Sequence, residues 1–261
     1  MIGHMAPTPT PTSTPHAAGT GTRRDRHRSA TMAELRAAAL AELHERGPTG
    51  LSLRGVARRM GMSPAGLYRY VDSRDALLTL LIADAYDDLA DGVRAALVAV
   101  ADADVADRLE AVCLAYRAWG VARPREFALV FGDPIPGYAA PAGGPTVDAM
   151  GRFGLAFATP LVEAWAQGRL VIPPELDDPA LAGATTPMAG FGGDIPPAGH
   201  ALFLVVWGRV HGQVALEVFG HHAWLFPDGC LPLFRAEVRT LARDLGLVAA
   251  QRPRTARATR K

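Results

Sequence analysis

The sequence lacks the features of a membrane, secreted or disulfide-bonded protein. No segment approaches the roughly 18 uncharged apolar residues that suggest a membrane helix, and the best candidate, residues 201–208, is too short. No positively charged segment followed by an apolar core opens the chain, so we expect no signal peptide. The two cysteines, Cys113 and Cys230, form no framework, and we expect reduced, buried thiols. The expected location is the cytoplasm, with no membrane partner.

Patterns for catalysis are also scarce. No Gly-x-Ser-x-Gly motif occurs, and the glycine runs at 142–144 and 190–193 do not lie between a strand and a helix, as phosphate-binding loops do. His221 and His222 match no standard zinc spacing. His211, on a helix, is more typical of a hydrogen-bonded core histidine than of a base. We therefore predict no enzyme, no catalytic residue, no cofactor and no metal.

The net charge is only +1, but it is unevenly distributed along the 261 residues. Residues 23–74 hold 11 arginines against 5 acidic residues, whereas residues 75–250 hold 11 arginines against 21 acidic residues. Residues 251–261 hold 5 basic residues and no acid. A basic head on an acidic body suits a protein that turns one face toward nucleic-acid phosphates.

Residues 49–75 predict two short helices joined by a tight turn. The first, about 52–60, begins at a serine N-cap, has apolar residues at three- and four-residue spacing, and ends at Gly61. The second, about 64–71, follows the cap residue Ser63 and has proline at its first position. An ordinary helical hairpin is the alternative interpretation of this spacing.

The second helix is better suited to a DNA groove than to solvent. Ala65 and Gly66 allow its first turn to approach a nucleic acid closely. Tyr68 and Tyr70 can donate hydrogen bonds to phosphates, and Arg69 can reach a phosphate or a guanine edge. Helix–turn–helix proteins place their second helix in the major groove in this way.

The run GMSPAGLYRYVDSRDALL resembles the recognition helix and following turn of TetR-family transcriptional regulators. Val71 stands where the family usually has an aromatic residue, Arg74 stands where lysine is usual, and Met62 is a third modest departure. The upstream run LSLRGVARRMG also fits, so the resemblance covers about residues 31–81. It implies an all-α protein with a three-helix DNA-binding head, followed by a helical body for ligand binding and dimerisation.

The expected DNA contacts come from this head and from a basic arm, residues 22–29. The resemblance implies phosphate contacts from Ser52, Arg54 and Arg74, which lie at helix N-terminal ends. The arm either lies in the minor groove or along the backbone, or is only a solubilising tail. The expected DNA-binding residues are Arg28, Ser52, Arg54, Ser63, Ala65, Gly66, Tyr68, Arg69, Tyr70 and Arg74.

Composition and periodicity divide the chain into four parts. They are a disordered N-terminal extension with the basic arm (1–28), the helix–turn–helix domain (29–75), a helical domain (76–248) to which the resemblance assigns ligand binding and dimerisation, and a basic disordered tail (249–261). Thr31 and Glu34 form the capping box expected at the first helix, which ends at Gly47. Further helices are expected over about 74–100, 104–122, 123–131, 145–168, 200–219 and 231–245, with breaker-rich loops at 132–144 and 173–197.

The aromatic residues of the body lie mostly on inner helix stripes. They either fill the core or, as the family resemblance implies, partly line a cavity for a small molecule. The pattern of Trp207, His211 and Gly212 also resembles the Trp-His-Gly signature of one class of TetR C-terminal domains. The expected ligand-binding residues are Tyr116, Trp119, Phe131, Phe153, Phe157, Trp165, Trp207 and His211.

The last two predicted helices are the expected dimer contact, because the family pairs them with their copies in a four-helix interface. Gly208, Gly212 and Ala215 form a small-residue stripe where another helix can come close. Alternatives are that the glycines make room for a ligand beside His211, or that both helices are core helices of a monomer. The expected interface residues are Gly208, Gly212, Ala215, Phe219, Phe234, Val238 and Leu241.

These observations predict a sequence-specific DNA-binding transcriptional regulator. The favoured form is a homodimeric repressor that a small-molecule inducer releases from a palindromic operator in double-stranded DNA. One alternative is a regulator without a ligand, controlled by its abundance or by a protein partner. The other is an enzyme or binding protein in which the helix–turn–helix has no role in DNA binding.

Overall fold

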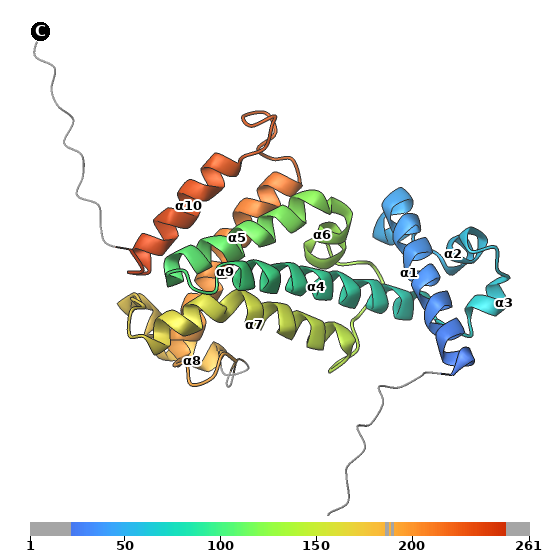
Figure 1. The fold of residues 1–261 in the computed structure, drawn as a ribbon, viewed down its shortest axis with the longest axis horizontal. Coiled ribbons are helices and arrows are strands. Elements are labelled where there is room, and N and C mark those ends of the chain that lie inside the picture. The colour runs from blue at the N-terminus through green and yellow to red at the C-terminus, as the bar shows by residue number, and fades with distance from the viewer. Residues whose placement is uncertain (1–21, 186–187, 189–190, 249–261) are drawn as a thin grey trace, which may run out of the picture.

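The computed structural model describes residues 22–185, 188 and 191–248. Within these residues the chain forms ten α-helices and one 3-10 helix, and no strand, as the sequence predicted. Three helices form a small head at one end, and the remaining helices form a larger body (Figure 1). Of the two terminal segments for which we expect disorder, residues 1–21 and 249–261 lie outside the described part of the chain, whereas residues 22–28 lie within it.

The helix–turn–helix forms where the sequence predicted it, as α2 (Leu53–Arg59) and α3 (Pro64–Leu67). Both predicted caps are present: the Ser52 hydroxyl accepts the Gly55 N–H, and the Ser63 hydroxyl accepts the Gly66 N–H, each at 3.1 Å. Gly61 ends α2 at φ 63°, in the left-handed region that glycine adopts without strain. The α-helix proper is shorter than the predicted 64–71, and turn hydrogen bonds continue to residue 71.

The start of the first helix was predicted wrongly. Helix α1 (Arg23–Gly50) begins at a capping box in which the Thr22 hydroxyl accepts the Asp25 N–H and the Asp25 carboxylate accepts the Thr22 N–H. Thr31 lies inside the helix and donates its hydroxyl to the carbonyl of His27. Residues 23–28 are therefore the first turns of α1 and not a separate arm. The predicted end is better placed, because the helix is interrupted at Gly47, where φ is 68°.

A buried carboxylate holds α1 against α2. Glu42 is fully buried, and its Oε2 accepts a hydrogen bond from Nε of Arg59 at 2.9 Å. Its Oε1 lies 3.0 Å from Nε of Arg46, within ion-pair distance. Gly55 on α2 leaves the space that this carboxylate occupies. This charged cluster thus adds to the apolar packing that orients the helix–turn–helix relative to α1.

The body is arranged around α4 (Arg74–Ala99), which runs from the head into the body with α5 and α7 packed along it (Figure 1). Ser73 caps α4 and Asp104 caps α5 through side-chain oxygens. Both caps lie where the predicted helix limits place them. The other elements are α5 (Val105–Ala122), α6 (Pro124–Phe131), α7 (Pro145–Ala166), η1 (Pro174–Leu176), α8 (Pro179–Ala184), α9 (Pro197–Val218) and α10 (Leu231–Asp244).

Two apolar cores are present, one in the head and one in the body. The head core is built from α1 to α4, but it also contains Leu129 of α6, and Ile135 and Tyr138 of the α6–α7 loop pack against it. Tyr86 on α4 packs against both cores. The body therefore reaches into the head through α6 and the loop that follows it.

Helix α9 is the one described helix that is long and apolar enough to cross a membrane. Core helices of soluble proteins pass the same test, so this is weak evidence for a membrane span. Of its apolar window, 28% is buried within the described chain. Much of this helix is therefore open to contact with another molecule.

Candidate DNA-binding face and ligand cavity

The outer surface of the helix–turn–helix carries several of the residues predicted to contact DNA. Ala65, Tyr68 and Arg69 are exposed, and Tyr68 exposes 51% of its surface. Arg54 on α2 is also exposed. These side chains are available to a groove or to phosphates. The hydroxyls of Ser52 and Ser63 already accept hydrogen bonds as helix caps, although a hydroxyl proton remains for a phosphate oxygen.

Helix α1 brings one arginine of the predicted arm to the recognition segment. The guanidinium carbon of Arg28 lies 5.8 Å from the centre of the Tyr70 ring, in a cation–π arrangement. Because residues 23–28 are helical and exposed, Arg28 is held beside this ring by the first turns of α1. The basic segment is therefore part of the head.

Arg74 is more engaged than the sequence suggested. Its Nε donates to the carbonyl of Leu51 at 3.1 Å, and its Nη2 donates to the carbonyl of Pro48 at 3.0 Å. These bonds tie the start of α4 to the end of α1. The predicted phosphate contact from Arg74 would therefore use the guanidinium N–H groups that do not donate to these carbonyls.

An aromatic cavity of about 480 Å³ lies in the body between α4, α6, α7 and α9. Five of the eight predicted ligand-binding residues line it: Phe131, Phe153, Phe157, Trp207 and His211. Sequence reasoning missed the other lining residues: Tyr86, Met150, Gly151, Gly154, Met188, Phe191, Phe203 and Leu204. Periodicity along a helix does not separate residues that fill the core from residues that line a cavity.

Three predicted ligand-binding residues lie elsewhere. Trp119 turns toward α4, where its Nε1 donates to Oδ2 of Asp88 at 2.7 Å. Trp165 lies beyond the cavity, near the end of α7, and exposes 36% of its surface. Tyr116 is fully buried behind the wall. Trp119 and Trp165 therefore do not line this cavity but border two smaller hollows, and their role in ligand binding stays a prediction.

Tyr116 supports the cavity through His211. Its hydroxyl lies 2.7 Å from Nδ1 of His211, and the imidazole is stacked on Trp207 with ring centres 4.9 Å apart. Burial lowers the pKa of His211 and raises the pKa of Tyr116. Both side chains are therefore neutral near pH 7.

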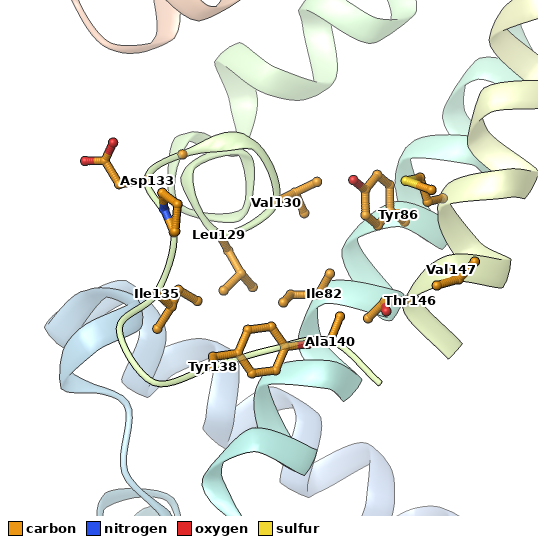
Figure 2. A pocket seen from close by; sticks show the side chains of 13 residues that line it. Ile82, Tyr86, Leu129, Val130, Asp133, Ile135, Tyr138, Ala140, Thr146 and Val147 are labelled. Atoms are coloured by element: carbon orange, nitrogen blue, oxygen red, sulfur yellow. The ribbon is translucent and has the colours of Figure 1, made fainter. Parts of the chain in front are cut away.

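A second cavity, of about 350 Å³, lies where the body meets the head. In Figure 2 the side chains of Ile82, Leu129 and Tyr138 converge on it from α4, α6 and the α6–α7 loop. The Tyr138 hydroxyl is 3.1 Å from the hydroxyl of Thr79 on α4. Tyr86 and Met150 line both cavities, so the two spaces are neighbours.

The predicted dimer residues fall into two groups. Gly208 and Gly212 lie on the open side of α9, where an added Cβ would meet nothing within 4 Å, and Phe219 exposes 45% of its surface. Ala215 is half-buried. Val205 and Leu216 extend this exposed apolar stripe, at 46% and 40%.

The structure places the three α10 residues predicted for the dimer interface inside the chain. Phe234, Val238 and Leu241 are at most 2% exposed, because they pack into the chain's own body core. They are therefore not a surface in this structure. Leu231 and Leu233, at the start of α10, expose 37% and 39% instead.

Among the described residues, no group of three histidine, cysteine or acidic side chains is arranged to hold a metal ion. Cys230 Sγ lies 3.7 Å from Nδ1 of His222, and both described cysteines are free. Burial raises the pKa of Cys113 to about 12 and that of Cys230 to about 11. Both thiols are therefore protonated and unreactive near neutral pH.

Two family profiles match the chain. Residues 35–81 match the bacterial regulatory proteins of the tetR family, and residues 109–241 match the tetracyclin repressor-like C-terminal domain. The HTH-type transcriptional regulator Rv1816 of Mycobacterium tuberculosis is 37% identical over 184 residues, which cover 69% of this chain and 77% of that protein. The regulator Mb1846 of Mycobacterium bovis matches to the same extent.

Solved structures share the fold. SCO4313, described as a regulatory protein, superposes with a TM-score of 0.67 at 34% identity, over 84% of this chain and 98% of that one. A protein of unknown function from Rhodococcus sp. RHA1 has a TM-score of 0.61 at 22% identity, over 90% of this chain and 100% of that one. The second likeness concerns the fold alone.

Proposed function

The chain belongs to the TetR family of transcriptional regulators, and we propose that it is a homodimeric repressor that a small-molecule inducer releases from a palindromic operator. The family is one of DNA-binding regulators and not of enzymes. The proposal concerns the finer steps: which residues read DNA, how two copies pair and how a ligand changes DNA binding.

For DNA recognition, the exposed surface of α3 is the element that enters the major groove. Arg69 reads a base edge or a phosphate, while Tyr68 binds a phosphate and sets the register of the head. Arg54 and Arg28 follow the backbone on either side. Support comes from the exposure of these side chains and from the basic charge of residues 23–74.

For dimerisation, the open stripe of α9 meets its copy across a two-fold axis. Val205, Leu216 and Phe219 supply apolar area, and Gly208 and Gly212 let the two backbones approach closely. An apolar helix with so little of its window buried is a liability for a monomer, which supports a partner on this side.

For induction, α6 connects the ligand cavity with the head. Phe131 lines the aromatic cavity, whereas Leu129, two residues earlier, is buried in the head core. A ligand that displaces Phe131 must also move or strain the helix that carries Leu129. His44 of α1 contacts Glu126 of α6 at 3.1 Å, a second link between the same elements. This dual packing of α6 is the observation that carries the proposal.

Selection of bound sequences from random DNA, with sedimentation of the complex, tests the proposal. The expected result is an inverted repeat bound by two-fold related subunits, because operator symmetry mirrors protein symmetry. Binding should weaken steeply with salt, whereas the preference for the selected site over random DNA should persist. Recovery of direct repeats only, or of no motif, would contradict the proposal.

A further inference from the structure

The walls of the aromatic cavity carry no formal charge. Its described lining is aromatic, aliphatic, thioether or glycine, and beyond the thioethers only Tyr86, Trp207 and His211 bring polar side-chain atoms. The undescribed residues flanking Met188 in the sequence are Thr186, Pro187, Ala189 and Gly190, and none is ionisable. An ion placed here would lose hydration without gaining a counter-charge, which is strongly unfavourable. The cavity therefore selects against charged molecules.

The aromatic lining of the cavity favours an aromatic occupant. The Trp207 ring packs edge-to-face against the rings of Phe153 and Phe157, with ring centres 5.6 and 5.4 Å apart. All three rings line the cavity. Gly151 and Gly154 on α7 leave one wall without side chains, and an added Cβ on Gly151 would meet nothing within 4 Å. A volume of about 480 Å³ lies within the roughly 300–1,000 Å³ of drug-sized ligand sites.

The hydrogen bond between Tyr116 and His211 determines which nitrogen of His211 is left to donate. The Tyr116 hydroxyl is buried, and Nδ1 of His211 is its hydrogen-bond partner among the described residues. A buried hydroxyl donates its proton to an acceptor, so Nδ1 accepts and the neutral ring carries its proton on Nε2. Nε2 points away from Tyr116 and makes no hydrogen bond to any described residue. His211 thus offers one N–H donor to an occupant.

We infer that the cavity binds an uncharged, flat aromatic molecule with a hydrogen-bond acceptor, such as a carbonyl or ether oxygen, that receives the Nε2–H of His211. The inference rests on the proposed function in one respect, since it takes this cavity to be the inducer site. It adds the chemical class of the inducer. The ring system lies between Trp207 and α7, and the acceptor turns toward α9.

Calorimetric titration of the full chain with three naphthalene probes tests the inference. 2-Acetylnaphthalene has the ring and the acceptor, 2-isopropylnaphthalene has the same shape without the acceptor, and 2-naphthoate has a charge. The acetyl probe should bind up to about 10-fold more tightly than the isopropyl probe, the effect of one hydrogen bond, and the anion should bind most weakly. Equal or tighter binding of the anion, or no binding of any probe, would overturn the inference.

Two substitutions identify the site, with a third as control. His211→Phe should remove the preference for acetyl over isopropyl while retaining the ring-binding affinity, an effect that mere loss of packing would not produce. Gly151→Leu should weaken both neutral probes by filling the open wall. Leu155→Ala, an exposed change on the same helix outside the cavity, should leave the order intact. A preference that survives His211→Phe would overturn the role of Nε2.

The same probes are then added to the complex with selected DNA. If they bind in the expected order but do not release DNA, the ligand class stands and release by an inducer fails. If the order is wrong, the ligand class fails whatever the DNA does. Folding of each variant is checked first by its thermal transition, so that loss of binding is not mistaken for loss of structure.

Discussion

Gly55 and Glu42 are mutually dependent: a Cβ on Gly55 would lie 2.0 Å from Oε1 and 2.5 Å from the carboxyl carbon of Glu42. Neither atom can remain where it is if residue 55 gains a methyl group. Glu42 would have to leave its contacts with Arg46 and Arg59, in a site where it is fully buried. The helix–turn–helix therefore requires glycine at this position of α2.

Gly55→Ala should accordingly destabilise the head by about 2 kcal/mol or more, since it disrupts a buried charged cluster. Gly92→Ala is the control, because Gly92 is an exposed glycine within α4 whose added Cβ would meet nothing within 4 Å. That change should be neutral or stabilising by up to about 1 kcal/mol. Denaturant unfolding of both variants measures the difference. Equal stabilities would mean that Glu42 relocates at no cost.

Arg69→Ala and Tyr68→Phe should separate reading of DNA from positioning on it. If Arg69 bonds a guanine edge, its loss should cost about 1–3 kcal/mol and relax the preference at one base pair per half-site. Tyr68→Phe should weaken all sequences alike, because a phosphate contact carries no base information. Arg94→Ala, far along α4 and paired with Asp91, is the control. Unchanged specificity in Arg69→Ala would assign this residue to phosphate contact.

Much of the fold could be predicted because short-range rules decide it. Ser52, Ser63 and Ser73 each stand before a predicted helix, and each caps the helix that follows. The error at the first helix arose from the same rule. Thr22 with Asp25 and Thr31 with Glu34 both satisfy the capping pattern, and nothing local decides between them.

The candidate site was less predictable from the sequence, because its lining depends on how each helix is turned about its axis and on which elements pack against it. Trp119 is one turn from Tyr116 on α5, yet it turns toward Asp88 of α4. Phe234 marks an apolar stripe on α10, but periodicity does not say whether the stripe meets the chain's own core or a second copy. No sequence pattern singled out Tyr86, because its position beside two cores and two cavities arises only in the folded chain.

The burial of His211 predicts a pH effect on stability. Its pKa is lowered from an ordinary value of 6.5, so the unfolded chain binds a proton at a higher pH than the folded chain does. Stability therefore falls as pH drops below about 6.5 and continues to fall down to the lowered folded pKa. The slope from one such group is at most about 1.4 kcal/mol per pH unit, and less here because the ring is partly exposed.

Urea unfolding of the wild type and of His211→Gln at pH 7.5, 6.5 and 5.5 measures this effect. The wild type should lose more stability than the variant over this range. Tyr116 does not contribute, because its raised pKa keeps it protonated throughout. Protein concentration is held constant, since dimerisation would shift apparent stability. Parallel pH curves for the two proteins would contradict the prediction.

Gly212→Leu tests the proposed dimer stripe of α9. Gly212 is not among the residues that line the aromatic cavity, and an added Cβ would meet nothing within 4 Å in the single chain. This position favours the helix-contact interpretation of the glycines over room for a ligand. Within one chain, leucine should even stabilise the helix, by about 0.5–1 kcal/mol relative to glycine.

The variant should therefore fold and yet sediment as a monomer, because leucine keeps two α9 helices apart where glycine lets them approach. Its affinity for the selected palindrome should fall, since each head then binds one half-site alone. Gly92→Leu is the matched control, because it makes the same exchange at an exposed helical glycine on α4 and should stay dimeric. A Gly212→Leu protein that remains a dimer with normal operator affinity would remove this stripe from the interface. Because a single chain has no reason to reject leucine here, a monomeric variant would point directly to the second copy.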